Sequence, residues 1–111
     1  LEYYKEIQNL ISRKLVQTSE VRRCACLLPA FAFIARQVKE RPLFFIEIGS
    51  SAGLNLLWHR YGYNYGQDIQ WGDINSPVQI NCTFQRNKPL IPQAFPKIIS
   101  CIGIDLNPIN L

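Results

Sequence analysis

Apolar side chains in the first part of the chain recur at the spacing of an amphipathic helix. Over residues 2–17 the gaps between them are three and four, so one helical face is apolar and the other polar. The apolar positions are Tyr3, Ile7, Leu10, Ile11, Leu15 and Val16. The pattern therefore predicts a first helix with one face suited to packing.

A second helix is expected after a short polar break. Thr18 or Ser19 can cap it, and Glu20 in its first turn is favourable to the helix dipole. The segment runs to about Glu40 and is apolar nearly all round in its middle, which predicts burial on more than one side. Because Pro29 lacks an N–H donor, it should end, kink or start a helical segment.

Two apolar runs have the length and composition of buried strands. The first, Leu43–Ile48, follows Arg41-Pro42, where the proline disfavours a helical conformation of the residue before it. Its near-continuous apolar character is typical of a parallel strand buried on both faces. The second run, Lys97–Asp105, ends on an acid, and Leu106-Asn107-Pro108 then turns the chain.

Residues 61–95 differ in character from the rest. They begin with a segment rich in tyrosine and glycine, and two short patterned runs follow at Ile69–Trp71 and Val78–Phe84. The second run alternates apolar and polar positions, as in a strand with one wet face. These runs predict an antiparallel hairpin, and the loop or short helix returning from it is marked by Pro89, Pro92 and Pro96.

Together the elements predict an α/β fold in two parts. Residues 1–40 form an N-terminal helical segment of two helices. Residues 41–111 form the first part of a Rossmann-like parallel sheet, with the antiparallel hairpin inserted at about residues 61–95. The chain begins at Leu1 and contains no methionine, so we expect a fragment without its native start, whose apolar sheet edges cause self-association.

The first strand is followed by five small residues, Gly49, Ser50, Ser51, Ala52 and Gly53. Such a turn leads from a parallel strand into a helix and lets the backbone approach a bound nucleotide or nucleoside. The free N–H groups at the start of that helix point to the ligand. At the end of the second strand, Asp105 has the position of a carboxylate that binds ribose hydroxyls. The two features together predict a cofactor site.

Charge and composition limit the classes of partner. The 111 residues carry 12 basic and 8 acidic side chains, and the scattering of the basic ones argues against nucleic-acid binding. No apolar run approaches the ~18 residues needed to span a membrane. The cysteines lack metal-site spacing, so we expect no metal and four reduced core or near-core thiols in a cytoplasmic protein; they are Cys24, Cys26, Cys82 and Cys101.

The turn resembles a cofactor-binding motif of class I methyltransferases. Glu47-x-Gly49-x-Ser51-x-Gly53 is similar to their motif I, and Gly103–Pro108 is similar to their second-strand acidic motif. The resemblance implies that S-adenosylmethionine is the cofactor. It implies that Glu47 and the turn residues surround the amino-acid end of this molecule and that Asp105 holds its ribose. Asn55, in the first helical turn, is placed to reach the ligand or a backbone group.

The sequence departs from this motif at two points. Ser51 stands where those enzymes usually have glycine, and serine fits there if its φ is negative. Asp105 lies 52 positions after Gly53, whereas ~20 residues is usual in a nucleotide-binding unit. The predicted hairpin accounts for the added length.

A closer resemblance covers most of the chain. Several strings in order are similar to an uncharacterised bacterial family, a domain of unknown function; they are Thr18–Arg23, Leu27–Pro29, Glu47–Tyr61, Tyr63–Gly66, Trp71–Asp73, Ser76–Val78 and Ile102–Pro108. This resemblance implies a Rossmann-like methyltransferase fold of which this chain is the N-terminal part, but no established activity.

Each candidate also has a structural interpretation. The small-residue turn can be a plain connection, Asp105 can cap the turn at Asn107, and Glu47 can satisfy loop N–H groups. His59 is either a general base or a packing or surface histidine. The aromatic residues from Tyr61 to Trp71 form either a substrate or partner surface or the core of the hairpin.

Three function hypotheses follow. The first is an S-adenosylmethionine-dependent methyltransferase, whose methyl acceptor the sequence does not identify. The second is a non-catalytic Rossmann-like binding or structural domain, for which Ser51 argues. The third is an NAD-linked oxidoreductase, although its G-x-G-x-x-G fingerprint is absent.

Overall fold

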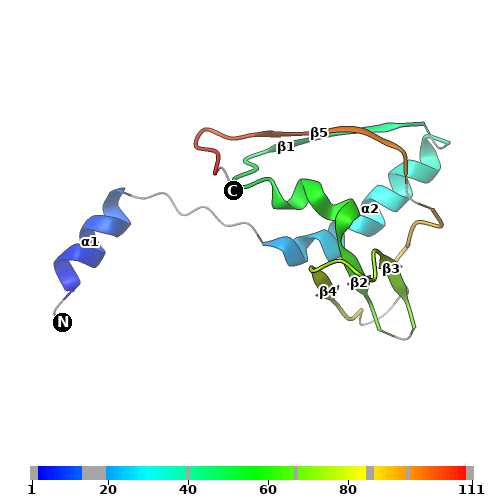
Figure 1. The fold of residues 1–111 in the computed structure, drawn as a ribbon, viewed down its shortest axis with the longest axis horizontal. Coiled ribbons are helices and arrows are strands. Elements are labelled where there is room, and N and C mark those ends of the chain that lie inside the picture. The colour runs from blue at the N-terminus through cyan, green and yellow to red at the C-terminus, as the bar shows by residue number, and fades with distance from the viewer. Residues whose placement is uncertain are drawn as a thin grey trace.

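Two separate β-sheets lie on either side of a helical layer (Figure 1). The computed structural model describes residues 3–13, 20–39, 41–66, 68–84, 87–94 and 96–109. Its helices are α1 (Tyr4–Arg13), α2 (Cys24–Gln37) and the 3₁₀ helices η1 (Val21–Arg23) and η2 (Leu54–Arg60). Its strands are β1 (Leu43–Ile48), β2 (Gly62–Asn64), β3 (Gln70–Gly72), β4 (Gln79–Asn81) and β5 (Ile98–Ile104). The predicted α/β class is confirmed.

The two apolar runs form the larger sheet. β1 and β5 pair in parallel, with Phe45 opposite Cys101 and Glu47 opposite Gly103. The predicted burial on both faces is wrong, because exposure alternates along β1: Phe45 packs on α2 and η2, whereas its neighbours Phe44 and Ile46 are exposed. Helices cover one face of this pair, and the other face has no cover among the described residues.

The helices before β1 differ in detail from the prediction. The first helix is confirmed over Tyr4–Arg13, and all its side chains are exposed; the proposed caps Thr18 and Ser19 lie outside the described residues. Glu20 is itself the N-cap of η1, since its carboxylate accepts the Arg22 N–H at 3.0 Å. η1 leads directly into α2, which ends at Gln37 rather than near residue 40.

Pro29 lies inside α2 and neither starts nor ends it. Its missing N–H leaves the carbonyl of Ala25, four residues earlier, without a helical donor. The Tyr65 hydroxyl donates to this carbonyl at 2.7 Å. Tyr65, which directly follows β2, thereby supplies the hydrogen-bond donor that the helix lacks at Pro29.

We expect Tyr65→Phe to lower the free energy of unfolding by about 1–2 kcal/mol, because it leaves the buried Ala25 carbonyl without a hydrogen-bond donor. Pro29→Ala restores an N–H for the same carbonyl, so the loss should be smaller by about 1 kcal/mol in that background. Urea denaturation of the double-mutant cycle measures the difference. As a control, Tyr61→Phe should have the same effect in both backgrounds, because its hydroxyl donates to Leu54; equal losses for Tyr65→Phe would contradict the coupling.

The smaller sheet contains an antiparallel pair within residues 61–95, as predicted, but its strands are not paired as expected. Its order is β3-β2-β4, with β2 antiparallel to β3 and parallel to β4. The patterned runs at 69–71 and 78–84 therefore do not pair with each other, and a strand through Gly62–Asn64 lies between them. Three residues beginning with glycine are too short to show an alternating pattern, which is why the sequence did not reveal β2.

The aromatic segment forms the core between the small sheet and the helices. Tyr61, Tyr63 and Tyr65 are buried together with Trp58 of η2. Each tyrosine hydroxyl donates to a backbone carbonyl, so burial leaves none of them without a partner. The interpretation of these residues as core is confirmed.

Candidate functional site

In the small-residue turn that follows β1, every second residue has a left-handed backbone conformation. Gly49, Ser51 and Gly53 have φ of +75°, +51° and +70°. The Gly53 N–H donates to the Ser50 carbonyl at 2.7 Å and closes the turn before η2. The condition of a negative φ at Ser51 is not met: the serine adopts the left-handed conformation that glycine would take, at a penalty of about 1 kcal/mol.

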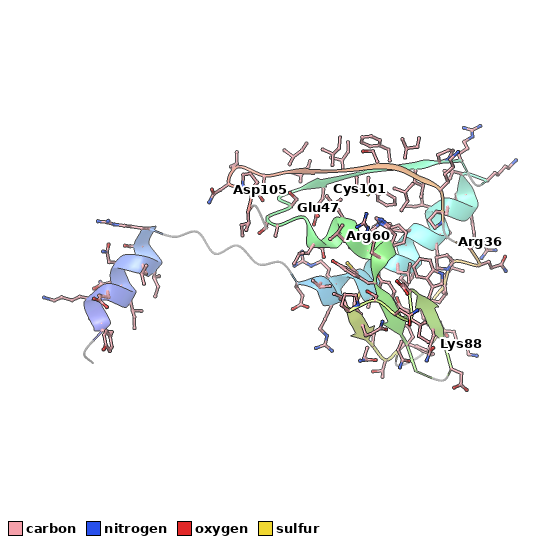
Figure 2. All side chains as sticks on the ribbon, viewed as in Figure 1. Arg36, Glu47, Arg60, Lys88, Cys101 and Asp105 are labelled. Carbon is pink, nitrogen blue, oxygen red and sulfur yellow. The ribbon has the colours of Figure 1, made fainter. Side chains whose placement is uncertain are left out.

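Asp105 lies against this turn. The Ser51 N–H donates to its Oδ2 at 2.7 Å, and the Asn107 N–H donates to Oδ1 at 2.8 Å. The N–H of Asn107, followed by that of Ser51, lowers the pKa of the Asp105 carboxyl below its usual value. Figure 2 shows Glu47 and Asp105 toward the same end of the β1–β5 pair. Asp105 thus caps its own turn and also joins the two strand ends.

Gly103 allows the turn to pack on β5. A Cβ at this position would lie 2.9 Å from the Ser50 Cβ and 3.3 Å from a Leu56 methyl group. Only glycine leaves room for the turn and η2 at this distance from the strand. Gly103 belongs to the acidic motif of the second strand, where its role was not predicted; its place two residues before the acid is the available signal.

Glu47 and Asn55 form a polar cluster beneath the turn. The Asn55 amide donates to Glu47 Oε1 at 2.9 Å, and the Cys24 thiol donates to Asn55 Oδ1 at 3.5 Å. Burial, followed by the charge of Glu47, raises the pKa of Cys24 to about 11, so the thiol stays protonated at neutral pH. Cys24 was not anticipated here, because its link to Glu47 passes through a residue distant in sequence.

Two buried oxygens near the turn have no hydrogen-bond partner among the described residues. They are Oε2 of Glu47 and the Ser51 hydroxyl. Such groups are rare in folded proteins, which marks these two oxygens for attention. The space where a Gly49 side chain would project is also open. The turn therefore has exposed backbone at Gly49, close to two buried oxygens that have no partner among the described residues.

The structure brings together most of the predicted site residues. Asp105 contacts Ser51, Glu47 contacts Asn55, and the intervening residues 49–53 connect the two pairs. Ser50 is buried against β5 and Ala52 is partly exposed. Their role in cofactor binding stays a prediction.

His59 lies near the end of η2 rather than in the turn. Its ring packs edge-on against Trp58, and Nδ1 is buried with no partner among the described residues. Burial, followed by the charge of Arg60, lowers the pKa of His59, so the imidazole is neutral at pH 7. No hydrogen bond in the described part of the chain joins His59 to Glu47 or Asp105. The packing interpretation fits this geometry.

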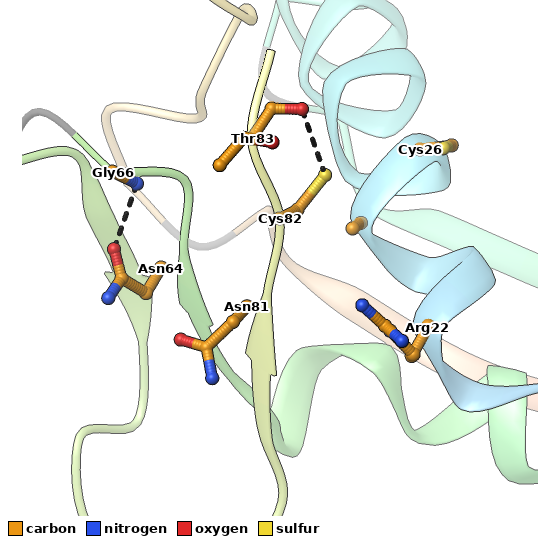
Figure 3. A pocket seen from close by; sticks show the side chains of 8 residues that line it. Arg22, Cys26, Asn64, Gly66, Asn81, Cys82 and Thr83 are labelled. Atoms are coloured by element: carbon orange, nitrogen blue, oxygen red, sulfur yellow. Dashed lines mark hydrogen bonds between the residues drawn. The ribbon is translucent and has the colours of Figure 1, made fainter.

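A cavity of about 470 Å³ lies away from the turn (Figure 3). It is lined by Arg22, Ala25, Cys26, Asn64, Gly66, Asn81, Cys82 and Thr83. Cys26 is exposed, so the prediction that all four cysteines are core or near-core residues is wrong for this one. Its helix presents it to the side opposite the buried Cys24 and Leu28.

Across the described ranges no helix has the length and apolar character needed to cross a membrane. No curated protein and no solved structure matches the chain. The family model described as "Uncharacterized protein conserved in bacteria (DUF2332)" matches residues 1–111. Since the match covers the whole chain, the protein belongs to this bacterial family, DUF2332.

Proposed function

We propose that this chain is the cofactor-binding part of an S-adenosylmethionine-dependent methyltransferase with a Rossmann-like fold. The observation that carries the proposal is the hydrogen bond between Ser51 N–H and Asp105. It joins a glycine-containing turn after one parallel strand to an acid at the tip of the adjacent strand. Nucleotide-type ligands of α/β sheets bind outside such carboxyl ends.

The residues at this edge fit the polar parts of the cofactor. Asp105 accepts hydrogen bonds and carries a negative charge, which suits the two hydroxyls of a ribose. Glu47 Oε2 lacks a partner among the described residues, which suits an amino group. The positive φ angles at Gly49, Ser51 and Gly53 turn the backbone sharply without large side chains.

When bound, the cofactor would supply an activated methyl group. The contribution of this chain would be to bind and orient the donor, so that an acceptor could attack in line. The described residues suggest no group that activates the acceptor, and the acceptor is not assigned.

A non-catalytic binding or structural domain is the second candidate. It is favoured by the same contact, because the Ser51 N–H and both oxygens of Asp105 already take part in internal hydrogen bonds. In this alternative the turn and Asp105 stabilise the junction between β1 and β5 and bind no cofactor.

Isothermal titration with S-adenosylhomocysteine separates the two candidates. We expect binding, weakened at least about tenfold by Asp105→Asn, because a charge-assisted hydrogen bond contributes about 1.5–3 kcal/mol. Asp73→Asn is the matched control: its Oδ1 accepts the Asn75 N–H at 2.8 Å, as Asp105 does from Asn107, but it lies outside the site. The control should bind as wild type.

Lack of binding by the folded wild-type chain at millimolar ligand would contradict the proposal and favour the non-catalytic domain. A parallel titration of NADH, followed by its fluorescence, tests the oxidoreductase hypothesis. Binding of NADH without S-adenosylhomocysteine would reassign the site.

A further inference from the structure

Two consecutive hydrogen bonds join the first residue of α2 to the carboxylate of β1. The Cys24 thiol donates to Asn55 Oδ1 at 3.5 Å, and the Asn55 amide donates to Glu47 Oε1 at 2.9 Å. Cys24 is fully buried at the start of α2, Asn55 belongs to η2 and Glu47 belongs to β1. Three elements that are separate in sequence therefore contribute to the position of one carboxylate.

The two ends of the Asn55 amide have partners of opposite kinds. A carboxylate only accepts hydrogen bonds, so Glu47 requires the NH₂ end of the amide. The oxygen end faces Cys24, and a thiol that keeps its proton donates to it. Burial, followed by the charge of Glu47, raises the pKa of Cys24 to about 11, so sulfur keeps this proton at neutral pH. Cys24 and Glu47 therefore favour the same orientation of the amide.

The second oxygen of the Glu47 carboxylate is the group that this arrangement directs. Because Asn55 binds Oε1, the direction in which Oε2 points is restricted. Oε2 is buried and has no hydrogen-bond partner among the described residues. A buried carboxylate oxygen gains most from a donor that carries a positive charge, since charge-assisted hydrogen bonds are the stronger ones. The chemistry of Oε2 therefore favours an ammonium group over a neutral ligand atom.

We propose that the Cys24–Asn55–Glu47 relay makes the site selective for ligands that carry a primary ammonium group. Cys24 is a positioning residue: it orients Asn55, and Asn55 directs Glu47 Oε2 to the ammonium. The inference rests on the proposed function, because it assigns the amino-acid end of the nucleoside cofactor to Glu47. It also gives α2, which precedes both strands of the site, a part in ligand selection.

Isothermal titration with two matched ligands tests this selectivity. They are S-adenosylhomocysteine and its deamino analogue, in which hydrogen replaces the amino group. We expect the wild-type chain to bind the first at least about tenfold more tightly, because only the first offers a charged donor to Glu47. Cys24→Ala should reduce this preference about three- to tenfold, since it removes one hydrogen bond from the relay, and should leave the affinity for the deamino analogue unchanged.

Two further variants separate positioning from a general structural role. Cys24→Ser keeps a hydrogen-bond donor and should restore most of the preference for the amino group. Cys82→Ala is the matched control, because the Cys82 thiol also donates to an oxygen, the Thr83 carbonyl at 3.7 Å, but lies outside the relay. It should have the preference of the wild type. A loss in Cys24→Ala that serine does not restore would contradict the role of the donor.

The side-chain amide of Asn55 gives a second readout that needs no ligand. In ¹H–¹⁵N NMR spectra of the free chain, Cys24→Ala should speed the exchange of its N–H protons with water about three- to tenfold, and Cys24→Ser should slow it again. Unchanged exchange in Cys24→Ala would overturn the proposal, because the thiol would then not order the amide.

The wild-type titrations distinguish failure of this inference from failure of the proposed function. Equal affinity for the two ligands would overturn the selectivity and leave the S-adenosylmethionine proposal standing. Absence of binding of either ligand at millimolar concentration would overturn both. Near-UV circular dichroism checks the folding of each variant, and the wild-type comparison decides the selectivity even if Cys24→Ala does not fold.

Discussion

Replacing Trp58 with alanine is expected to lower the free energy of unfolding by about 3–5 kcal/mol. The side chain belongs to η2 and is 1% exposed. Its ring centroid is 4.9 Å from Phe31 of α2, 5.4 Å from Phe45 of β1 and 6.0 Å from Trp71 of β3. Removing it leaves a cavity at the point where three elements meet. Its indole N–H has no partner among the described residues, so the loss is one of packing.

Leu57→Ala is the matched control for Trp58→Ala. Leu57 precedes Trp58 in η2 but is 37% exposed. Its truncation should lower the free energy of unfolding by about 1 kcal/mol or less, because less buried surface is lost. Urea denaturation followed by far-UV circular dichroism measures both variants without relying on tryptophan emission. Equal losses would mean that Trp58 does not join the layers.

Gly72→Ala is expected to destabilise the chain by at least about 3 kcal/mol, or to prevent folding. Gly72 has φ of +87°, and a Cβ there would overlap the carbonyl oxygen of Tyr61 on the neighbouring chain segment. Backbone atoms cannot rotate away as a side chain can, so β3 would have to separate from β2. Thermal unfolding followed by circular dichroism would show the loss.

Gly66→Ala distinguishes the effect of the overlap from that of the backbone angle. Gly66 has φ of +75°, close to that of Gly72, but nothing lies within 4 Å of its added Cβ. This variant should lose only about 1 kcal/mol, the penalty of a left-handed alanine. If Gly72→Ala lost no more than Gly66→Ala, the close approach of β3 to Tyr61 would be disproved.

The parts of the fold that could be predicted are those with long apolar runs. Leu43–Ile48 and Ile98–Ile104 form parallel strands, as their composition indicated. β2 could not be predicted, because three residues give no period. The alternating exposure along β1 also could not be predicted: composition shows that a strand is apolar but not which of its faces another layer covers. The division at residues 40 and 41 stays a prediction.

The sequence predicted that the ends of two strands form the candidate site, but it did not predict all of the contacts within that site. The small residues after β1 and the acid after β5 meet through Ser51 and Asp105, as parallel pairing requires. The positive φ of Ser51 could not be predicted, because serine rarely adopts it and the tertiary surroundings override that preference. The Asn55 link to Cys24 depends on tertiary packing, which no local pattern encodes.

The parallel pairing of β1 and β5 also affects the order in which the chain can assemble during synthesis. Phe44 pairs with Ser100, so β1 leaves the ribosome long before its partner. Strands that are closer in sequence, such as β2 and β3, can pair earlier, and their pairing closes a smaller loop. The turn after β1 acquires its Asp105 contact only once the chain is made past that residue. The candidate site is therefore among the last features of the described chain to form.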